Sequence, residues 1–145
     1  MTTREILRIV RKMPLSQDDQ VKYKSLYLQT ARQYVTELKD GLNQLGTGSG
    51  TDEVVASLHR AAHSLGSQSA MMSYDSMKMI SSTLEKIFKA RVEKKIDISD
   101  ALLANLVSAV NEMEKCLNSI DTDTKEIDLS KTVELLKSTA NIPEV

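Results

Sequence analysis

Residues 58–72 read LHRAAHSLGSQSAMM, and the spacing of their apolar and small side chains predicts a helix with one buried face. With a valine just before the stretch, these side chains recur at intervals of three and four, at Val55, Leu58, Ala62, Leu65, Ser69 and Met72. The stretch also contains both histidines of the sequence, His59 and His63, followed by a run of small residues. We therefore expect a helix that buries one side in a bundle and carries both imidazoles beside it.

Three further segments show the same spacing, one before this stretch and two after it. Their apolar positions are Leu28, Ala31, Val35, Leu38, Leu42 and Leu45, then Met77, Ile80, Leu84 and Ile87, and finally Leu103, Leu106, Val110, Met113, Leu117 and Ile120. The connections between them are short: a glycine-rich stretch at 46–50, turn and cap residues at 73–76, and a break in the pattern at 94–100. This arrangement predicts an all-α fold, an antiparallel up-down-up-down four-helix bundle.

Two shorter helices are expected at the ends of the chain. Residues 3–12 form a short amphipathic pattern ended by Pro14, and a last apolar set before Pro143 consists of Leu129, Val133, Leu136 and Ala140. The first segment is basic, as in helices that lie on membranes, but it is short, and we expect it to pack against the bundle. A length of 145 residues fits one domain, 1–145, with the core bundle at about 17–121.

The composition argues against several functions. Nineteen basic and 20 acidic residues give no field that attracts nucleic acid, and four tyrosines and one phenylalanine offer little for base stacking. No apolar run approaches the ~18 residues of a membrane span. The single Cys116 excludes an internal disulfide and is expected to be a small buried side chain rather than a catalytic thiol. We expect a reduced, cytoplasmic protein that is a monomer, binds no nucleic acid and does not insert into membranes.

The spacing of the two histidines places them beside the core. They are four residues apart, so they share a helix face, and each directly follows a residue of the buried seam, which is about 100° of rotation. Glu85 stands in the same relation to Leu84 on the next helix. The two helices should turn near Tyr74, which is midway between positions 63 and 85. The spacing therefore predicts that the carboxylate of Glu85 meets the imidazole of His63.

A contact of this kind has a chemical use. A carboxylate that accepts a hydrogen bond from one ring nitrogen fixes the tautomer of a histidine and leaves the other nitrogen free as a nucleophile. An exposed histidine oriented in this way can accept a phosphoryl group and pass it on.

The run LHRAAHSL at 58–65, followed by GSQSAMMSY at 66–74, resembles the histidine-containing phosphotransfer (Hpt) domain. It is most similar to the version at the N-terminus of chemotaxis-type histidine kinases, where the motif runs roughly F-R-A-A-H-S/T-L/I-K-G-x-x-G. The resemblance extends over about residues 20 to 120. It implies that His63 is the phosphoacceptor and that Glu85 orients it.

The sequence departs from this motif at the family's lysine, where it has Gly66. As replacements for its positive charge we consider Arg60, one turn before His63, and Lys78, Lys86 and Lys89 on the next helix. Other glycines of the motif are replaced by residues that are still small, so a partner's surface can approach closely. The expected docking residues are Arg60, Ser64, Gly66, Ser67, Gln68 and Ala70. His59 occupies a position that is usually apolar in the family, and we expect it to be a partly buried packing neighbour.

Three alternatives remain open. The chain could be a degenerate domain that keeps the fold for protein interaction but has lost transfer. His59 and His63 at this spacing could bind zinc with Glu85, although Arg60 replaces the glutamate of H-E-x-x-H, and we assign no metal ligands. In the dimerisation helix of a sensor kinase, an acidic residue typically follows the histidine, whereas Ser64 follows it here.

The preferred hypothesis is a phosphorelay module that is not itself a kinase. A histidine kinase catalytic domain or a phosphorylated receiver would supply the phosphoryl group to His63, and the aspartate of a response-regulator receiver domain would accept it. No cofactor is expected in this chain, because the Mg²⁺ that phosphoryl transfer requires would belong to the partner.

Overall fold

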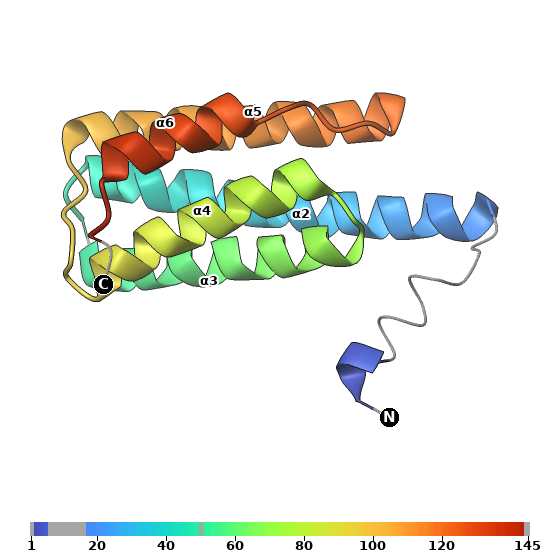
Figure 1. The fold of residues 1–145 in the computed structure, drawn as a ribbon, viewed down its shortest axis with the longest axis horizontal. Helices are drawn as coiled ribbons and strands as arrows, with labels where there is room; N and C mark the ends of the chain where they lie inside the picture. Colours follow the sequence, from blue (N-terminus) through green and yellow to red (C-terminus); the bar gives the residue numbers. More distant parts are fainter. Residues whose placement is uncertain (1, 6–16, 50, 144–145) are drawn as a thin grey trace.

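The computed structural model describes residues 2–5, 17–49 and 51–143. Its main elements are α2 (Gln17–Gly46), α3 (Thr51–Met71), α4 (Asp75–Val92), α5 (Asp100–Asp123) and α6 (Ser130–Ala140). Helices α2 to α5 run in alternating directions, and α6 turns back along α5 (Figure 1). Within these described ranges there is no strand, and no helix is long and apolar enough to cross a bilayer. The predicted all-α antiparallel bundle is confirmed.

The predicted N-terminal helix lies largely outside the described residues. Residues 3–5 are helical, and Thr2 and Glu5 cap this turn reciprocally, with the Glu5 amide donating to Thr2 Oγ1 at 3.1 Å and the Thr2 amide to Glu5 Oε2 at 3.2 Å. The remainder of the prediction, residues 6–12 and Pro14, falls in the part of the chain that is not described.

The predicted seams form a single core. Nearly all of their residues are buried, whereas Leu45, Met72 and Leu103 are only partly so. Helix α6 contacts both α4 and α5. It contributes Val133, Leu136 and Ala140 to the same core, together with Leu129 at its N-cap. Cys116 is fully buried as expected, and burial raises the pKa of its thiol to about 11. The C-terminal helix is therefore an integral layer of the bundle.

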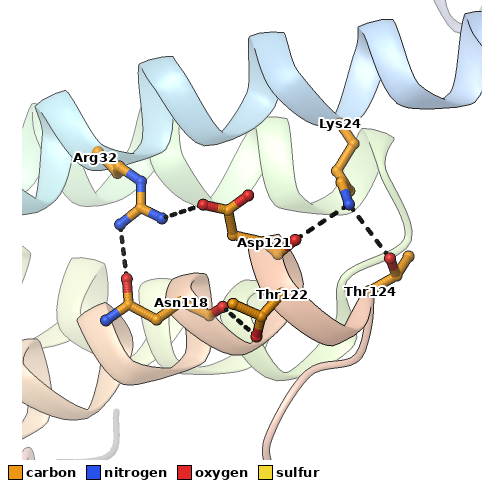
Figure 2. Close-up of polar contacts among 6 residues, drawn as sticks. All are labelled: Lys24, Arg32, Asn118, Asp121, Thr122 and Thr124. Atoms are coloured by element: carbon orange, nitrogen blue, oxygen red, sulfur yellow. Dashed lines mark hydrogen bonds and ion pairs between the residues drawn. The ribbon is translucent and has the colours of Figure 1, made fainter.

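Polar contacts fasten the C-terminal end of α5 to α2 (Figure 2). Arg32 donates to Asn118 Oδ1 at 2.9 Å and to Asp121 Oδ2 at 3.2 Å. Lys24 Nζ donates to the backbone carbonyl of Asp121 at 3.4 Å and to Thr124 Oγ1 at 3.3 Å. The last turn of α5 has no basic residue of its own. Lys24 therefore supplies the positive charge that favours a helix C-terminus.

The start of α4 is capped by a residue far away in the sequence. We expected residues 73–76 to supply the cap, but Tyr74, at the N-cap position, makes no side-chain cap hydrogen bond. Instead, the backbone N–H of Met77 donates to Glu126 Oε2 at 2.8 Å. The carboxylate of Glu126 accepts from an N–H that has no partner within the helix, and its negative charge interacts favourably with the positive end of the α4 dipole.

A buried hydrogen-bond chain links α2 to α3 at the same end of the bundle. The hydroxyl of Ser69 donates to the carbonyl of Leu65 at 2.7 Å, so its oxygen accepts from the Tyr27 hydroxyl at 2.8 Å. Burial raises the pKa of Tyr27 well above its ordinary value, and the phenol stays neutral and able to donate. The Tyr27 ring also packs on Tyr74, with 4.8 Å between ring centroids. These contacts fix the C-terminal half of α3.

Helices α2 and α3 approach closely at Gly41, which allows a stability prediction. A Cβ added at Gly41 would lie 2.5 Å from Leu58 Cδ2, and Leu58 is fully buried. We expect Gly41→Ala to lower the free energy of unfolding, because overpacking costs about 1–3 kcal/mol and outweighs a helix-propensity gain of about 1 kcal/mol. Chemical denaturation measures the difference.

The matched control is Gly66→Ala on α3. A Cβ there would meet Ser81 Cβ at 3.4 Å, an ordinary contact, so we expect no loss of stability. Equal effects of the two substitutions would contradict the close approach at Gly41.

Candidate functional site

His63 lies in the middle of α3 and projects from the bundle. Its side chain is 62% exposed, because position 63 follows the buried Ala62 by one residue and is turned to the shoulder of the helix. Across from it on α4, Glu85 follows the buried Leu84 in the same way, and its side chain is 30% exposed. His63 Nδ1 is 2.8 Å from Glu85 Oε1. The predicted contact is present.

This geometry determines which nitrogen is free. An ionised carboxylate can only accept a hydrogen bond, so the hydrogen of the neutral imidazole resides on Nδ1. The lone pair is then on Nε2, the far corner of an exposed ring. The arrangement presents an oriented nitrogen nucleophile to any molecule that approaches the α3 surface.

His59 faces the same carboxylate from one turn earlier on α3. Its side chain is 31% exposed, and its Nε2 is 3.9 Å from Glu85 Oε1. That nitrogen is buried and has no hydrogen-bond partner among the described residues. The sequence predicted partial burial of His59 but not its orientation toward Glu85. The shared shoulder of positions 59, 63 and 85 is the signal from which this orientation could have been inferred.

Gly66 was expected on the docking surface, but it is buried. It is buried against α4, where an added Cβ would contact Ser81, so it does not lie on the exposed face with His63. Position 66 is about 60° from His63 around the helix, on the side of α4. Gly66 therefore belongs to the packed face between α3 and α4, where a Cβ would still fit in ordinary contact.

The other expected docking residues differ in their exposure. Arg60 and Ser67 are exposed beside it, and Arg60 donates to Ser57 Oγ at 3.0 Å. Ser64, Gln68 and Ala70 are partly buried. Arg60 and Ser64 line a groove of about 560 Å³ between α2 and α3, which also contains the carboxylates of Glu37, Asp40 and Glu53.

A second groove between α2 and α3 is apolar. It measures about 310 Å³, and its lining includes Gln68 and the exposed side chains of Tyr23, Leu26 and Met71. Met71 is about 80° from His63 around α3 and two turns further along. An apolar surface therefore lies close to the exposed imidazole on the α2 side.

The three lysines proposed as a source of charge are all on α4 and exposed. Among the described residues, none of their side-chain ammonium groups makes a hydrogen bond or an ion pair. Lys78 and Lys89 lie within about 40° of Glu85 around α4, whereas Lys86 is about 100° away. Lys78 and Lys89 are thus the two whose side chains start on the Glu85 side of the helix.

The zinc alternative receives no support from this geometry. Among the residues that the structure describes, no three His, Cys, Asp or Glu side chains form a group that could hold a metal ion. Nδ1 of His63 is already occupied by its hydrogen bond to Glu85.

Comparisons with known proteins agree with this fold. The family model described as the Hpt domain matches residues 22–136. Among solved structures, the chain is similar to the phosphorylated P1 domain of CheA3 from R. sphaeroides, whose structure was determined in complex with CheY6. The TM-score is 0.76 at 15% sequence identity, over 83% of this chain and 96% of that one. No curated protein matches the sequence.

Proposed function

Because the chain belongs to the Hpt domain family, we propose that His63 accepts a phosphoryl group and passes it to the aspartate of a response-regulator receiver domain. The observation that carries this proposal is the exposed His63, whose Nδ1 is bonded to Glu85 at 2.8 Å. Membership of the family supports the role of a phosphotransfer carrier. The assignment of His63 as the acceptor rests on its contact with Glu85. His59 is a poorer acceptor because its Nε2 is buried.

The chemical step follows from the orientation of His63. The lone pair of Nε2 attacks phosphorus, the Nε2–P bond forms, and the bond from phosphorus to the donor's oxygen breaks. The hydrogen on Nδ1 remains, so positive charge develops on the ring next to the Glu85 carboxylate, which stabilises it. In the return step the Nε2–P bond breaks and the aspartate oxygen of the receiver takes the phosphoryl group.

The remaining requirements of the reaction are assigned to the partners. Phosphoryl transfer depends on in-line positioning and on neutralising the charge of the equatorial oxygens, commonly by Mg²⁺. The partner kinase or receiver would hold this ion. Arg60 at the surface, and Lys78 and Lys89 on α4, supply supporting positive charge without a bound ion of their own. The chain is thus a carrier that catalyses nothing in the absence of a partner.

The surface near His63 suits a receiver domain. Ser67 is exposed on the His63 face, and the apolar groove lined by Tyr23, Leu26 and Met71 provides area that association would remove from water. The structurally similar P1 domain of CheA3 was captured with CheY6, which supports a partner of this kind. We propose that the receiver covers the α2–α3 surface beside His63 and places its aspartate near Nε2.

The test is transfer of labelled phosphate to the purified chain. We expect the protein to become labelled when it is incubated with Mg²⁺ and either a phosphorylated receiver domain or an active chemotaxis-type kinase with ATP. The bound phosphate should be lost in acid and retained in base, because a phosphorus–nitrogen bond has that stability and a phosphoserine does not. A chain that stays unlabelled with both donors would show that it keeps the fold without the transfer activity.

A further inference from the structure

The second histidine has a feature that the proposed reaction does not use. Nε2 of His59 is buried and unpaired, and it faces the same oxygen, Glu85 Oε1, that accepts the hydrogen bond of His63. Buried polar atoms are nearly always paired, so an unpaired nitrogen aimed at a carboxylate needs an explanation.

A small side-chain movement would bring His59 Nε2 and Glu85 Oε1 within hydrogen-bond distance. At 3.9 Å the two atoms are too far apart for a hydrogen bond, and bringing them within range takes a shift of about 1 Å. Nε2 of His59 is itself closed to bulk solvent, so water at the surface does not reach it directly. Glu85 is partly exposed and its carboxylate can rotate, so the contact closes by a side-chain movement.

We propose that His59 is a positioning residue that donates its Nε2–H to Glu85 and so holds the carboxylate in place for His63. An ionised carboxylate has about four acceptor sites, so Glu85 can accept from both imidazoles at once. The neutral imidazole with its hydrogen on Nε2 is sufficient, and no change of charge is needed.

The neighbouring charges are compatible with this role. The guanidinium of Arg60 donates a hydrogen bond to Ser57 Oγ. Among the described residues, no lysine or arginine side chain is bonded to Glu85. Lys89 starts one turn after Glu85 on α4 and is exposed. The two histidines are therefore the groups that contact or approach the Glu85 oxygen. The consequence for phosphotransfer rests on the proposed function, whereas the hydrogen bond itself does not.

Two substitutions at the same position separate donation from packing. His59→Gln places an amide N–H near the position of the ring Nε2 and retains a donor. His59→Leu keeps an apolar side chain on the shoulder of α3 but removes the donor. Thermal unfolding of both variants checks that the bundle is intact.

The first measurement is the tautomer of His63 in the unphosphorylated protein, from long-range ¹H–¹⁵N correlation spectra. We expect the wild type and His59→Gln to carry the His63 hydrogen on Nδ1. In His59→Leu the Nε2–H tautomer should increase, because Glu85 is held from one side only. An unchanged tautomer balance in His59→Leu would overturn the proposal.

The second measurement is the rate of phosphorylation by phosphoramidate, a small donor that releases ammonia and needs no docking surface. We expect His59→Leu to be slower than wild type by about tenfold, a typical effect of losing an outer hydrogen bond to a functional group. His59→Gln should stay close to wild type. Equal losses in both variants, or a faster reaction in His59→Leu, would contradict a positioning role.

The two proposals fail in different ways. If the wild type takes no phosphate from receiver, kinase or phosphoramidate, the proposed function is wrong, and the tautomer measurement still decides whether His59 holds Glu85. If the wild type is labelled but His59→Leu matches it in rate and in tautomer, only the role of His59 is wrong.

Discussion

Replacing His63 by glutamine is expected to abolish labelling of the chain by a phosphorylated receiver or an active kinase. Glutamine has a similar reach and still offers a hydrogen-bond partner to Glu85, but its amide nitrogen has no lone pair that can attack phosphorus. We expect a loss of at least about 10³-fold, the scale at which a covalent nucleophile is removed. Autoradiography after gel electrophoresis in neutral or alkaline conditions measures it.

The substitution should leave the fold intact, because the side chain of His63 is largely exposed and contributes nothing to the core. Unfolding of the variant checks this. The second histidine provides an internal control, because a chain that retains label after His63→Gln must carry the phosphate elsewhere. Residual labelling near the wild-type rate would show that His63 is not the acceptor.

Replacing Glu85 by alanine is expected to slow phosphorylation of His63 by about 10- to 100-fold. The carboxylate fixes the Nδ1–H tautomer and stabilises the charge that develops on the ring, and both contributions disappear. Glu85→Gln separates them, because it retains the shape of the side chain and an accepting oxygen but lacks the charge. We expect it to fall between wild type and alanine. Initial rates at saturating donor provide the comparison.

An exposed glutamate elsewhere provides the matched control for this series. Glu93 lies just after α4 and contacts only Lys95 among the described ion pairs, so Glu93→Ala should react at the wild-type rate. If Glu85→Ala also reacts at that rate, Glu85 does not orient His63, even though the two side chains are in contact.

The contact between His63 and Glu85 could be predicted from the sequence because it depends on helix periodicity alone. Each residue follows a buried neighbour by one position, and the turn near Tyr74 sets both at the same height. The four seams were predictable for the same reason, since their burial repeats with the period of the α-helix.

Contacts that depend on distant segments could not be predicted in this way. Nothing around residue 77 indicates that Glu126 would cap α4, because the two are 49 positions apart and the loop after α5 brings them together. Gly66 stands at the position of the motif lysine and was expected on the docking surface, but it is buried against α4. The orientation of His59 toward Glu85 was not predicted either, although its position on the same shoulder of α3 as His63 indicates it.

The cap that Glu126 provides for α4 has a consequence for how the site assembles. The pair formed by His63 and Glu85 belongs to a local hairpin of two helices, which can come together early because its contacts are close in sequence. The cap on the first turn of α4 instead depends on a residue 49 positions away, after α5, and closing the longer loop costs more entropy. The contact that orients the nucleophile thus lies within one helical hairpin, whereas the cap on the second helix of that hairpin comes from the last third of the chain.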